Sequence, residues 1–374
     1  MKIKKLLITL IFLLATIAPE AFSETTGNDS SPTNIAIMDF LTEYLKNLET
    51  KNWDALAQQI PDDFYYRGLK KIYTLKKLRL IFSEVTGTIL SHKESIHENA
   101  DGTYVLKFMM DVNGNSIPDS LFFRITTRGV QLAGNRCRAF GDIFFSKILN
   151  RLQRFGVYLP PGYDSQKKYP VIINLLGASE AFSGWIRPEI TQICDKEIRS
   201  WRVNEFIGIS PQGKRGGMWM NWNDTIHLTE DIILKELLPH IDAIYPTYAT
   251  ANKRAIQGIS NGGYGAFSYA IRHPELFCAA ISYSGPLAAA HPLCPELSPI
   301  YLAQSLYPFP AVDLFFTAGD QDELGMDRQA DLFQSVLVKR HIPATRMQFK
   351  GGHYHQEWLQ HLPLGLKFIS QSFR

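Results

Sequence analysis

A serine between two glycines is the feature of this sequence best suited to nucleophilic chemistry. The motif Gly258-Ile-Ser260-Asn-Gly262 follows an apolar segment and precedes a helix-like run of small residues from Gly263. On a sharp strand-to-helix turn the serine backbone is strained and its hydroxyl is exposed, while flanking glycines let neighbouring chains approach closely. The alternative is a glycine-rich loop with an incidental serine. The strand and helix patterns around the motif favour Ser260 as the nucleophile.

A serine hydroxyl is a weak nucleophile, so it needs a general base and a group that orients this base. Two downstream segments offer such groups in the chain order nucleophile, acid, histidine. The first is an apolar segment that ends at Ala318 and is followed by Asp320 and Asp322. The second places His353 directly after a pair of glycines. We interpret His353 as the base, and either aspartate as the group that faces it.

Short apolar segments alternate with helical segments around these residues, which is typical of a buried, mostly parallel sheet covered by helices. The sequence predicts strands at 171–176, 206–210, 254–258, 279–284 and 312–318. It predicts helices between them, notably at 228–244, 263–272 and 328–339. Parallel strands end at one edge of a sheet, so we expect the candidate residues to meet at that edge.

From about residue 142 to the end, the chain resembles the secreted α/β-hydrolase esterases, a family that includes feruloyl esterases, esterase D and the mycolyltransferases. The matching segments are 157–164, 169–173, 230–242, 258–266, 319–322 and 351–358. The resemblance implies an α/β-hydrolase fold and a serine esterase that works through an acyl-enzyme without a cofactor. Its Gly-x-x-Asp pattern selects Asp322 as the acid, which leaves Asp320 as a turn residue.

One departure from the family concerns the loop after the first central strand. Many members carry His-Gly there, whereas this chain has Leu176-Gly177-Ala178. An oxyanion hole needs backbone N–H donors rather than that histidine side chain, so we expect the N–H groups of Ala178 and Asn261 to serve. The change is expected to affect substrate preference more than catalysis.

The substrate and the reaction leave alternatives open. We expect a small-molecule or carbohydrate-linked ester, while the mycolyltransferase branch of the resemblance implies acyl transfer to a sugar hydroxyl by the same triad. A third hypothesis is a non-catalytic protein that binds a ligand through its N-terminal part. Four tryptophans could stack on a sugar or phenolic ring, although buried packing explains each of them equally well: Trp185, Trp219, Trp222 and Trp358.

The N-terminal part predicts a separate α+β domain over 35–140, before a hydrolase domain over 141–374. Helical periodicity over 35–60 is broken near Lys51, a further helix is predicted at 72–82, and strand-forming residues follow from Gly87 onward. The segment 40–66 resembles the start of NTF2-like cone domains. Because the esterase motifs lie downstream, we expect the hydrolase domain to fold and act without this domain.

A turn between two predicted strands of the N-terminal domain carries oxygen-rich side chains. The side chains at positions 1, 3, 5 and 9 of this segment resemble short calcium loops, which suggests a weak Ca²⁺ site formed by Asp111, Asn113, Asn115 and Asp119. The alternative is a plain hairpin turn, since Asn-Gly is a strong hairpin signal.

The first residues have the pattern of an export signal. A basic start, an apolar run over 6–18 and small residues before a cut after Ser23 predict a signal peptide at 1–23 and a flexible leader at 24–34. We therefore expect a periplasmic or secreted protein with no membrane span after signal removal. The formal charge of the chain is +3, of which the first 23 residues carry two units, so nucleic acid is a poor candidate partner.

The chain has four cysteines, Cys137, Cys194, Cys278 and Cys294. After export they would meet an oxidising compartment, in which disulfides persist. Three complete pairings of four cysteines exist, and the sequence does not select one of them. None of the spacings resembles a zinc site.

Overall fold

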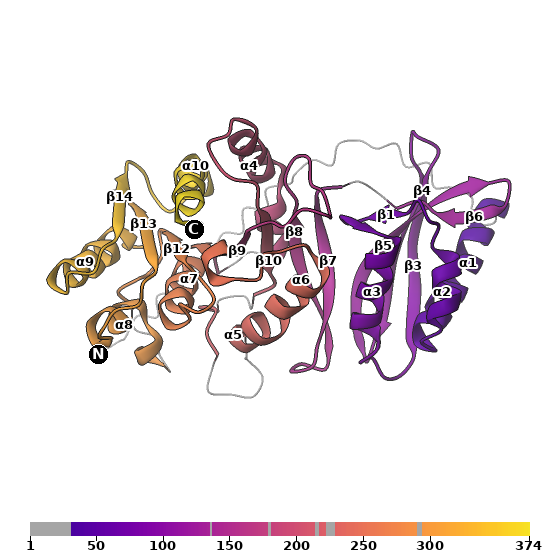
Figure 1. The fold of residues 1–374 in the computed structure, drawn as a ribbon, viewed down its shortest axis with the longest axis horizontal. Helices are drawn as coiled ribbons and strands as arrows, with labels where there is room; N and C mark the ends of the chain where they lie inside the picture. Colours follow the sequence, from indigo (N-terminus) through magenta and orange to yellow (C-terminus); the bar gives the residue numbers. More distant parts are fainter. Residues whose placement is uncertain (1–30, 135–136, 179–180, 214–216, 222–228, 290–293) are drawn as a thin grey trace, which may run out of the picture.

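The computed structural model describes residues 31–374 apart from 135–136, 179–180, 214–216, 222–228 and 290–293. Two units lie side by side along the longest axis of the molecule (Figure 1). The larger unit is built on an eight-stranded sheet and the smaller one on a four-stranded sheet. Short strands β1 (Tyr65–Tyr66) and β2 (Leu69–Lys70) form a separate two-stranded ribbon.

The large sheet has the strand order β14-β13-β12-β11-β9-β10-β8-β7. Its strands are β7 (Ala139–Ser146), β8 (Arg151–Tyr158), β9 (Val171–Leu175), β10 (Ile207–Pro211), β11 (Arg254–Ile259), β12 (Ala279–Tyr283), β13 (Asp313–Gly319) and β14 (Thr345–Phe349). From β14 to β10 all neighbours are parallel, and β8 and β7 extend the edge antiparallel. This confirms the predicted mostly parallel sheet and the five predicted strands.

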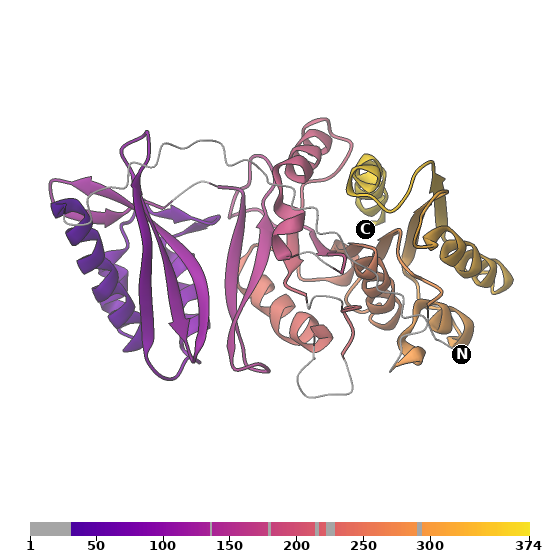
Figure 2. The same ribbon diagram turned by 180° about the vertical axis from the view of Figure 1, so that it is seen from behind.

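Helices cover both faces of this sheet, which explains why every residue of β9 to β12 is buried. Figures 1 and 2 show α4 (Pro188–Arg199) and α10 (His355–Ser372) on one side, with α6 (Leu238–Ile244), α7 (Asn261–Arg272), α8 (Pro299–Ser305) and α9 (Met326–Lys339) on the other. The short helical turns are η1 (Phe182–Ile186), α5 (Thr229–Asp231), the π-helical η2 (Ile232–Leu237), η3 (Ala251–Lys253) and η4 (Pro295–Leu297).

The smaller unit packs three helices against an antiparallel sheet, in the order β3-β4-β5-β6, and is therefore the predicted α+β unit. Its helices are α1 (Pro32–Glu49), α2 (Trp53–Gln59) and α3 (Lys71–Phe82), and its strands are β3 (Ile89–Glu98), β4 (Tyr104–Val112), β5 (Asn115–Thr126) and β6 (Gly129–Leu132). One core joins helices and sheet, with Ile37 and Leu41 from α1 meeting Leu106 and Phe108 from β4.

Helix α1 begins earlier than the sequence analysis predicted. Ser31 caps the helix by accepting a hydrogen bond from the backbone N–H of Asn34 at 3.1 Å, and Pro32 occupies the first turn. Serine followed by proline is a typical helix start, because proline fixes a helical φ and lacks the N–H that would stay unpaired there. Residues 32–34 are thus helical rather than part of a flexible leader, and the predicted signal peptide at 1–23 lies outside the described residues.

The boundary between the units falls at the start of β7, two residues before the predicted one. This strand belongs to the large sheet and contributes to both hydrophobic cores, with Ile143 in the core of the smaller unit and Phe144 in the core of the larger unit. The side chains of a strand alternate between its two faces, so a single strand can serve two cores. The edge strand of the large sheet is therefore covered by the N-terminal unit.

A buried group of charged side chains lies where the two units meet. The Asp142 carboxylate on β7 accepts hydrogen bonds from Lys77 Nζ of α3 and from the Tyr245 hydroxyl, the latter at 2.7 Å. Arg67 lies 3.5 Å from the same carboxylate and 2.6 Å from the carboxylate of Asp119. Burial alone would raise the pKa of Asp142, but Lys77 and Arg67 outweigh this effect and hold the pKa below its usual range.

These contacts bear on the expectation that the hydrolase unit folds by itself. A fragment that starts at residue 142 would lose the first residues of β7. It would also lose both cations that pair with Asp142, together with the unit that covers the apolar side chains of β7 such as Ile143. Exposing an apolar edge strand is unfavourable, so we infer that the two units stabilise each other.

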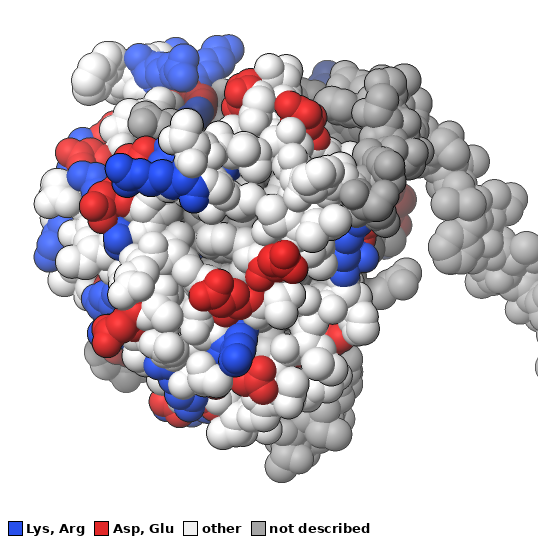
Figure 3. Space-filling model, turned by 90° about the vertical axis from the view of Figure 1, so that its right-hand side faces the viewer, with Lys and Arg blue, Asp and Glu red and all other residues white. Residues whose placement is uncertain are grey.

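The outer face of the N-terminal unit, drawn in Figure 3, shows basic and acidic side chains interspersed among uncharged ones. Such a mixed surface does not attract a polyanion. In the part of the chain that the structure describes, no helix combines the length and the apolar character needed to cross a membrane.

We predict that Lys77→Met lowers the free energy of unfolding by about 3 kcal/mol, because it leaves the Asp142 carboxylate buried with one cation less. Urea denaturation followed by circular dichroism measures the loss. Lys147→Met is the matched control, since Lys147 pairs with Glu84 at the surface and its loss should cost less than about 1 kcal/mol. Equal stability of the two variants would contradict the prediction.

Candidate active site

Ser260 lies on the turn between β11 and α7, with φ of 52° and ψ of −123°. This conformation is unfavourable for a residue with a side chain, and it persists only where the surroundings enforce it. A Cβ atom at Gly258 would lie 2.1 Å from the carbonyl oxygen of Gly262, and a Cβ atom at Gly262 would lie 2.4 Å from that of Leu175. Both positions therefore require glycine, which confirms the physical reason given for the motif.

The predicted acid and base lie against each other. Nδ1 of His353 is 2.8 Å from Oδ2 of Asp322, and the Asp322 side chain is fully buried. The other carboxylate oxygen of Asp322 accepts a hydrogen bond from the backbone N–H of Leu324 at 3.0 Å. These two contacts fix both the carboxylate and the ring that it faces.

Asp320 has a different place on the same turn. Its carboxylate accepts a hydrogen bond from the backbone N–H of Gly351 at 3.1 Å, and it is exposed. The neighbouring Glu323 accepts from the backbone N–H of His353, also at 3.1 Å. The two carboxylates therefore hold the loop that carries the histidine, while Asp322 alone of the three contacts its ring.

Ser260 and His353 line the same cavity of about 270 Å³ at the carboxyl end of the parallel strands. The predicted oxyanion residue Ala178 lines it as well, next to Gly177. As first residue of α7, Asn261 has a backbone N–H with no partner within the helix. Its side-chain amide donates to the carbonyl oxygen of Gly217 at 3.2 Å, which holds the asparagine side chain against that segment.

Two buried tryptophans hold the chain that leads into the oxyanion loop. The indole N–H of Trp185 donates to the carbonyl oxygen of Leu175 at 3.1 Å, and that of Trp219 donates to the carbonyl oxygen of Leu176 at 2.9 Å. The two indoles come from η1 and from the segment after β10. Gly262 of the nucleophile turn packs on the same two carbonyl groups. The loop predicted to form the oxyanion hole and the turn at Ser260 are thus positioned through one pair of peptide groups.

These hydrogen bonds favour buried packing over substrate stacking as the role of Trp185 and Trp219. Trp185 and Trp219 are 3% and 4% exposed and hydrogen-bonded to backbone, so neither presents a free face to a substrate. Trp358 is buried at the wall of the cavity and packs against Trp185 with ring centroids 5.5 Å apart. Trp222 lies outside the described residues.

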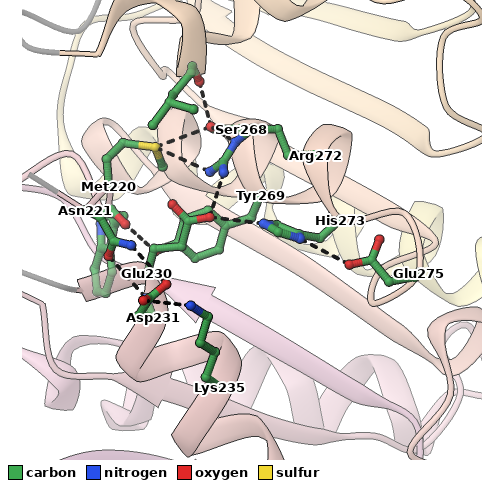
Figure 4. A network of polar contacts seen from close by, with 12 residues as sticks. Met220, Asn221, Glu230, Asp231, Lys235, Ser268, Tyr269, Arg272, His273 and Glu275 are labelled. Carbon is green, nitrogen blue, oxygen red and sulfur yellow. Dashed lines mark hydrogen bonds and ion pairs between the residues drawn. The ribbon is translucent and has the colours of Figure 1, made fainter. Parts of the chain in front are cut away.

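The segment that carries Trp219 is fastened to helix α7. The Tyr269 hydroxyl donates to the carbonyl oxygen of Trp219, whose φ of 68° is rare for a residue with a side chain. Next to it, the sulfur of Met220 lies 3.3 Å from the Ser268 hydroxyl oxygen and accepts a hydrogen bond from the Arg272 guanidinium at 3.6 Å (Figure 4). Because α7 begins at the nucleophile turn, these contacts hold the indole in a fixed position relative to Ser260.

A second layer of the same network anchors α7 to the helix that starts at α5 (Figure 4). The carboxylate of Glu230 lies 2.7 Å from the guanidinium of Arg272 and 3.0 Å from Nε2 of His273. Burial would raise the pKa of Glu230, but hydrogen bonds from His273 and Arg272 hold it below its usual range. Asn221 exchanges hydrogen bonds with Asp231 at 3.0 and 3.2 Å and so ties the Trp219 segment to this helix.

The cavity also contains residues that the sequence analysis did not single out. Ser284 follows β12 with φ of 50° and is buried at the cavity wall. The sequence could have indicated Ser284, because residues that follow the carboxyl end of a parallel strand commonly line the ligand site. His355 lines the same cavity with both ring nitrogens buried, and its Nε2 lies 3.6 Å from the carboxylate of Glu189. Nothing in its sequence context marks this histidine.

The predicted calcium ligands do not come together. They lie along a β-hairpin whose two-residue turn has positive φ at Asn113 and Gly114, the geometry that Asn-Gly favours. Asp111 and Asp119 lie on opposite faces of the sheet, because Asp111 alternates with buried residues of β4 whereas Asp119 shares the buried face of β5. Asn115 donates its amide to the carbonyl oxygen of Leu152.

The arrangement therefore fits a hairpin rather than a calcium loop. Arg67 already engages the Asp119 carboxylate at 2.6 Å. Within the described ranges, no group of three or more His, Cys, Asp or Glu side chains is placed to hold a metal ion. The Asn-Gly hairpin, which was the alternative, accounts for the motif.

The mostly parallel sheet and the nucleophile turn at the end of β11 define the class of the protein as an α/β-hydrolase. The model of the Esterase family matches residues 146–369, and the chain belongs to that family. A solved ferulic acid esterase is similar to it, with a TM-score of 0.57 and 26% sequence identity over 63% of this chain and 98% of that chain.

Two known proteins share part of this sequence. Esterase Rv1288 of Mycobacterium tuberculosis is 42% identical over 148 residues, which are 35% of this chain and 28% of that protein. The endo-1,4-beta-xylanase/feruloyl esterase of Xylanibacter ruminicola is 30% identical over 145 residues, which are 36% of this chain and 20% of that protein. The chain thus spans less than a third of either relative. The family match begins beyond the N-terminal unit, whose NTF2-like character stays a prediction.

We predict that Trp219→Phe and Trp185→Phe each lower kcat for a small ester on the order of 10-fold, with little change in KM. Loss of the indole N–H frees a carbonyl that fixes the oxyanion loop, and small misplacements at a reacting centre are costly. Steady-state hydrolysis of p-nitrophenyl acetate measures both constants. Replacing Trp219 by 3-benzothienylalanine keeps the shape without the N–H and should reproduce the loss; unchanged kcat in that variant would refute the role of the hydrogen bond.

Proposed function

We propose that the protein is a serine carboxylic-ester hydrolase whose triad is Ser260, His353 and Asp322. The observation that carries this proposal is the 2.8 Å contact between Asp322 and His353 at the cavity that Ser260 lines. Membership of the Esterase family agrees with it. A protein that only bound a ligand would have no physical reason to keep a buried carboxylate against that histidine.

In the proposed reaction the Ser260 hydroxyl attacks the ester carbonyl carbon while His353 takes the hydroxyl proton. The oxygen of the tetrahedral intermediate becomes an anion, which the backbone N–H groups of Ala178 and Asn261 stabilise. Collapse of this intermediate breaks the bond to the alcohol, which leaves with the proton from the histidine. Water then attacks the acyl-enzyme by the same route and releases the acid and Ser260. These steps need no cofactor.

The proposed substrate is a small-molecule or carbohydrate-linked ester. The names of two relatives, a feruloyl esterase fused to a xylanase and a ferulic acid esterase, support an ester of an aromatic acid. The cavity wall supports it as well, because Leu324, Phe349, Tyr354 and Trp358 give one side an apolar lining. An aromatic acyl group would bury its ring against these side chains.

The proposed location is outside the cytoplasm, in the periplasm or the medium. The signal-peptide pattern at 1–23 supports export.

The structure leaves Cys137, Cys194 and Cys278 as thiols, and burial raises the pKa of Cys194, which makes that thiol unreactive.

We predict that Ser260→Ala reduces hydrolysis of p-nitrophenyl acetate by several orders of magnitude, on the scale of 10³-fold or more, while the fold stays intact. A fluorophosphonate probe should label the wild-type chain at Ser260 and leave the variant unlabelled. Circular dichroism of the variant serves as the folding control. Substantial turnover by a correctly folded Ser260→Ala chain would contradict the proposed nucleophile.

The two aspartates of the turn after β13 allow a matched comparison. Asp322→Asn should lower kcat on the order of 10² to 10⁴-fold, because the amide no longer orients the His353 ring in the productive tautomer. Asp320→Asn should stay near the wild-type kcat and lower the melting temperature, since Asp320 accepts a backbone hydrogen bond. The reversed pattern of kcat would assign the acid to Asp320.

A further inference from the structure

A basic groove lies at the amino ends of the parallel strands, whereas the candidate active site lies at their carboxyl ends. It has a volume of about 700 Å³, and Pro170, Glu205 and Lys253, which line it, lie one or two residues before the starts of β9, β10 and β11. The candidate nucleophile and acid follow the carboxyl ends of β11 and β13. A ligand in this groove would therefore leave the catalytic cavity open.

Packing within the fold does not account for a tryptophan at position 201, which lines this groove. Its side chain is 94% exposed and its φ is 60°. The residue lies two positions beyond the end of α4, with its backbone N–H bonded to the carbonyl oxygen of Ile198 at 3.0 Å. Glycine or asparagine usually takes such a position, because a side chain in the left-handed region costs about 1 kcal/mol. A tryptophan here gains no packing that offsets this cost.

The groove also concentrates positive charge beside aromatic rings. Four of its lining residues are basic, Lys167, Lys168, Arg199 and Lys253, against one acidic residue, Glu205. Lys167 engages Glu205, so the lining has a surplus of three positive charges, of which Arg199 also lies 4.0 Å from the Asp195 carboxylate. The second exposed aromatic residue of the lining is Tyr248, 43% exposed, with the Lys253 ammonium 5.7 Å from its ring centroid. The rest of the chain carries almost no net charge, so this surplus is local.

We propose that this groove binds an acidic polysaccharide, a chain of sugars that bear carboxylates. The apolar face of a sugar ring stacks on Trp201 or Tyr248, and the carboxylates pair with Lys168, Arg199 and Lys253. A bilayer is excluded because a flat surface does not enter a concave groove. A nucleic acid carries a charge on every unit and requires a longer basic track than this one. The site would hold the protein on a polymer while the catalytic cavity stays accessible.

The test measures binding of the full-length protein to polygalacturonate by affinity electrophoresis and calorimetry, at low salt and at 0.3 M NaCl. Wild type should bind at low salt and weaken as salt rises, since ion pairs at the surface are screened. Trp201→Ala should lose roughly tenfold in affinity, which corresponds to about 1.4 kcal/mol for one lost stacking contact. Lys168→Gln/Lys253→Gln should weaken binding as well and reduce its salt dependence.

Tyr307→Ala is the matched control, because this tyrosine is 90% exposed elsewhere on the surface and its loss should not affect binding. Hydrolysis of p-nitrophenyl acetate should stay at the wild-type rate in Trp201→Ala, which separates this proposal from the proposed catalytic function. Absence of binding, equal binding of neutral arabinan, or an unaltered affinity of Trp201→Ala would each overturn it. Tighter binding of a single-stranded oligothymidine than of polygalacturonate would replace the polysaccharide by nucleic acid.

Discussion

The close contact between the nucleophile turn and the end of β9 is the constraint on which the site depends. Gly262 lies against the carbonyl groups of Leu175 and Leu176, where any side chain would clash. The same two carbonyls accept the indole N–H groups of Trp185 and Trp219. Because one pair of peptide groups contacts both the turn at Ser260 and the tryptophans, the predicted oxyanion donor Ala178 and Ser260 cannot shift independently. Preorganised donors of this kind need no rearrangement when charge develops.

A second constraint joins the two units of the chain. Asp142 on the edge strand of the hydrolase sheet is neutralised from the N-terminal unit by Lys77 and Arg67. Side chains of β7 enter both hydrophobic cores. Apolar packing and buried charge pairing thus act at one interface, and breaking it would expose an apolar strand and an unpaired carboxylate together. The N-terminal unit is consequently part of the stable fold rather than an appendage.

Local patterns predicted most of the elements near the site because each has a signal within a few residues. Continuous apolar runs predicted β9 to β13, and the glycine spacing predicted the turn at Ser260. The hairpin at Asn113 had an equally strong local signal, but the acidic residues around it suggested a calcium loop. Only the alternation of Asp111 and Asp119 between opposite faces of the sheet decided against it. The predicted domain boundary fell two residues inside strand β7, whose side chains serve both cores.

The order of serine, acid and histidine and the glycines around the serine are readable along one chain, and they predicted the esterase chemistry that we propose. Resemblance to the Gly-x-x-Asp pattern of the family selected Asp322 over Asp320, and the structure places Asp322 against His353. Tertiary structure alone decided what depends on contacts between distant segments. Examples are the carbonyl partners of Trp185 and Trp219, the cations that face Asp142, and the gathering of Trp201 and Tyr248 at one groove. The physical reason is that hydrogen bonds and ion pairs between segments depend on how the helices and strands pack, and a local pattern carries no record of that packing.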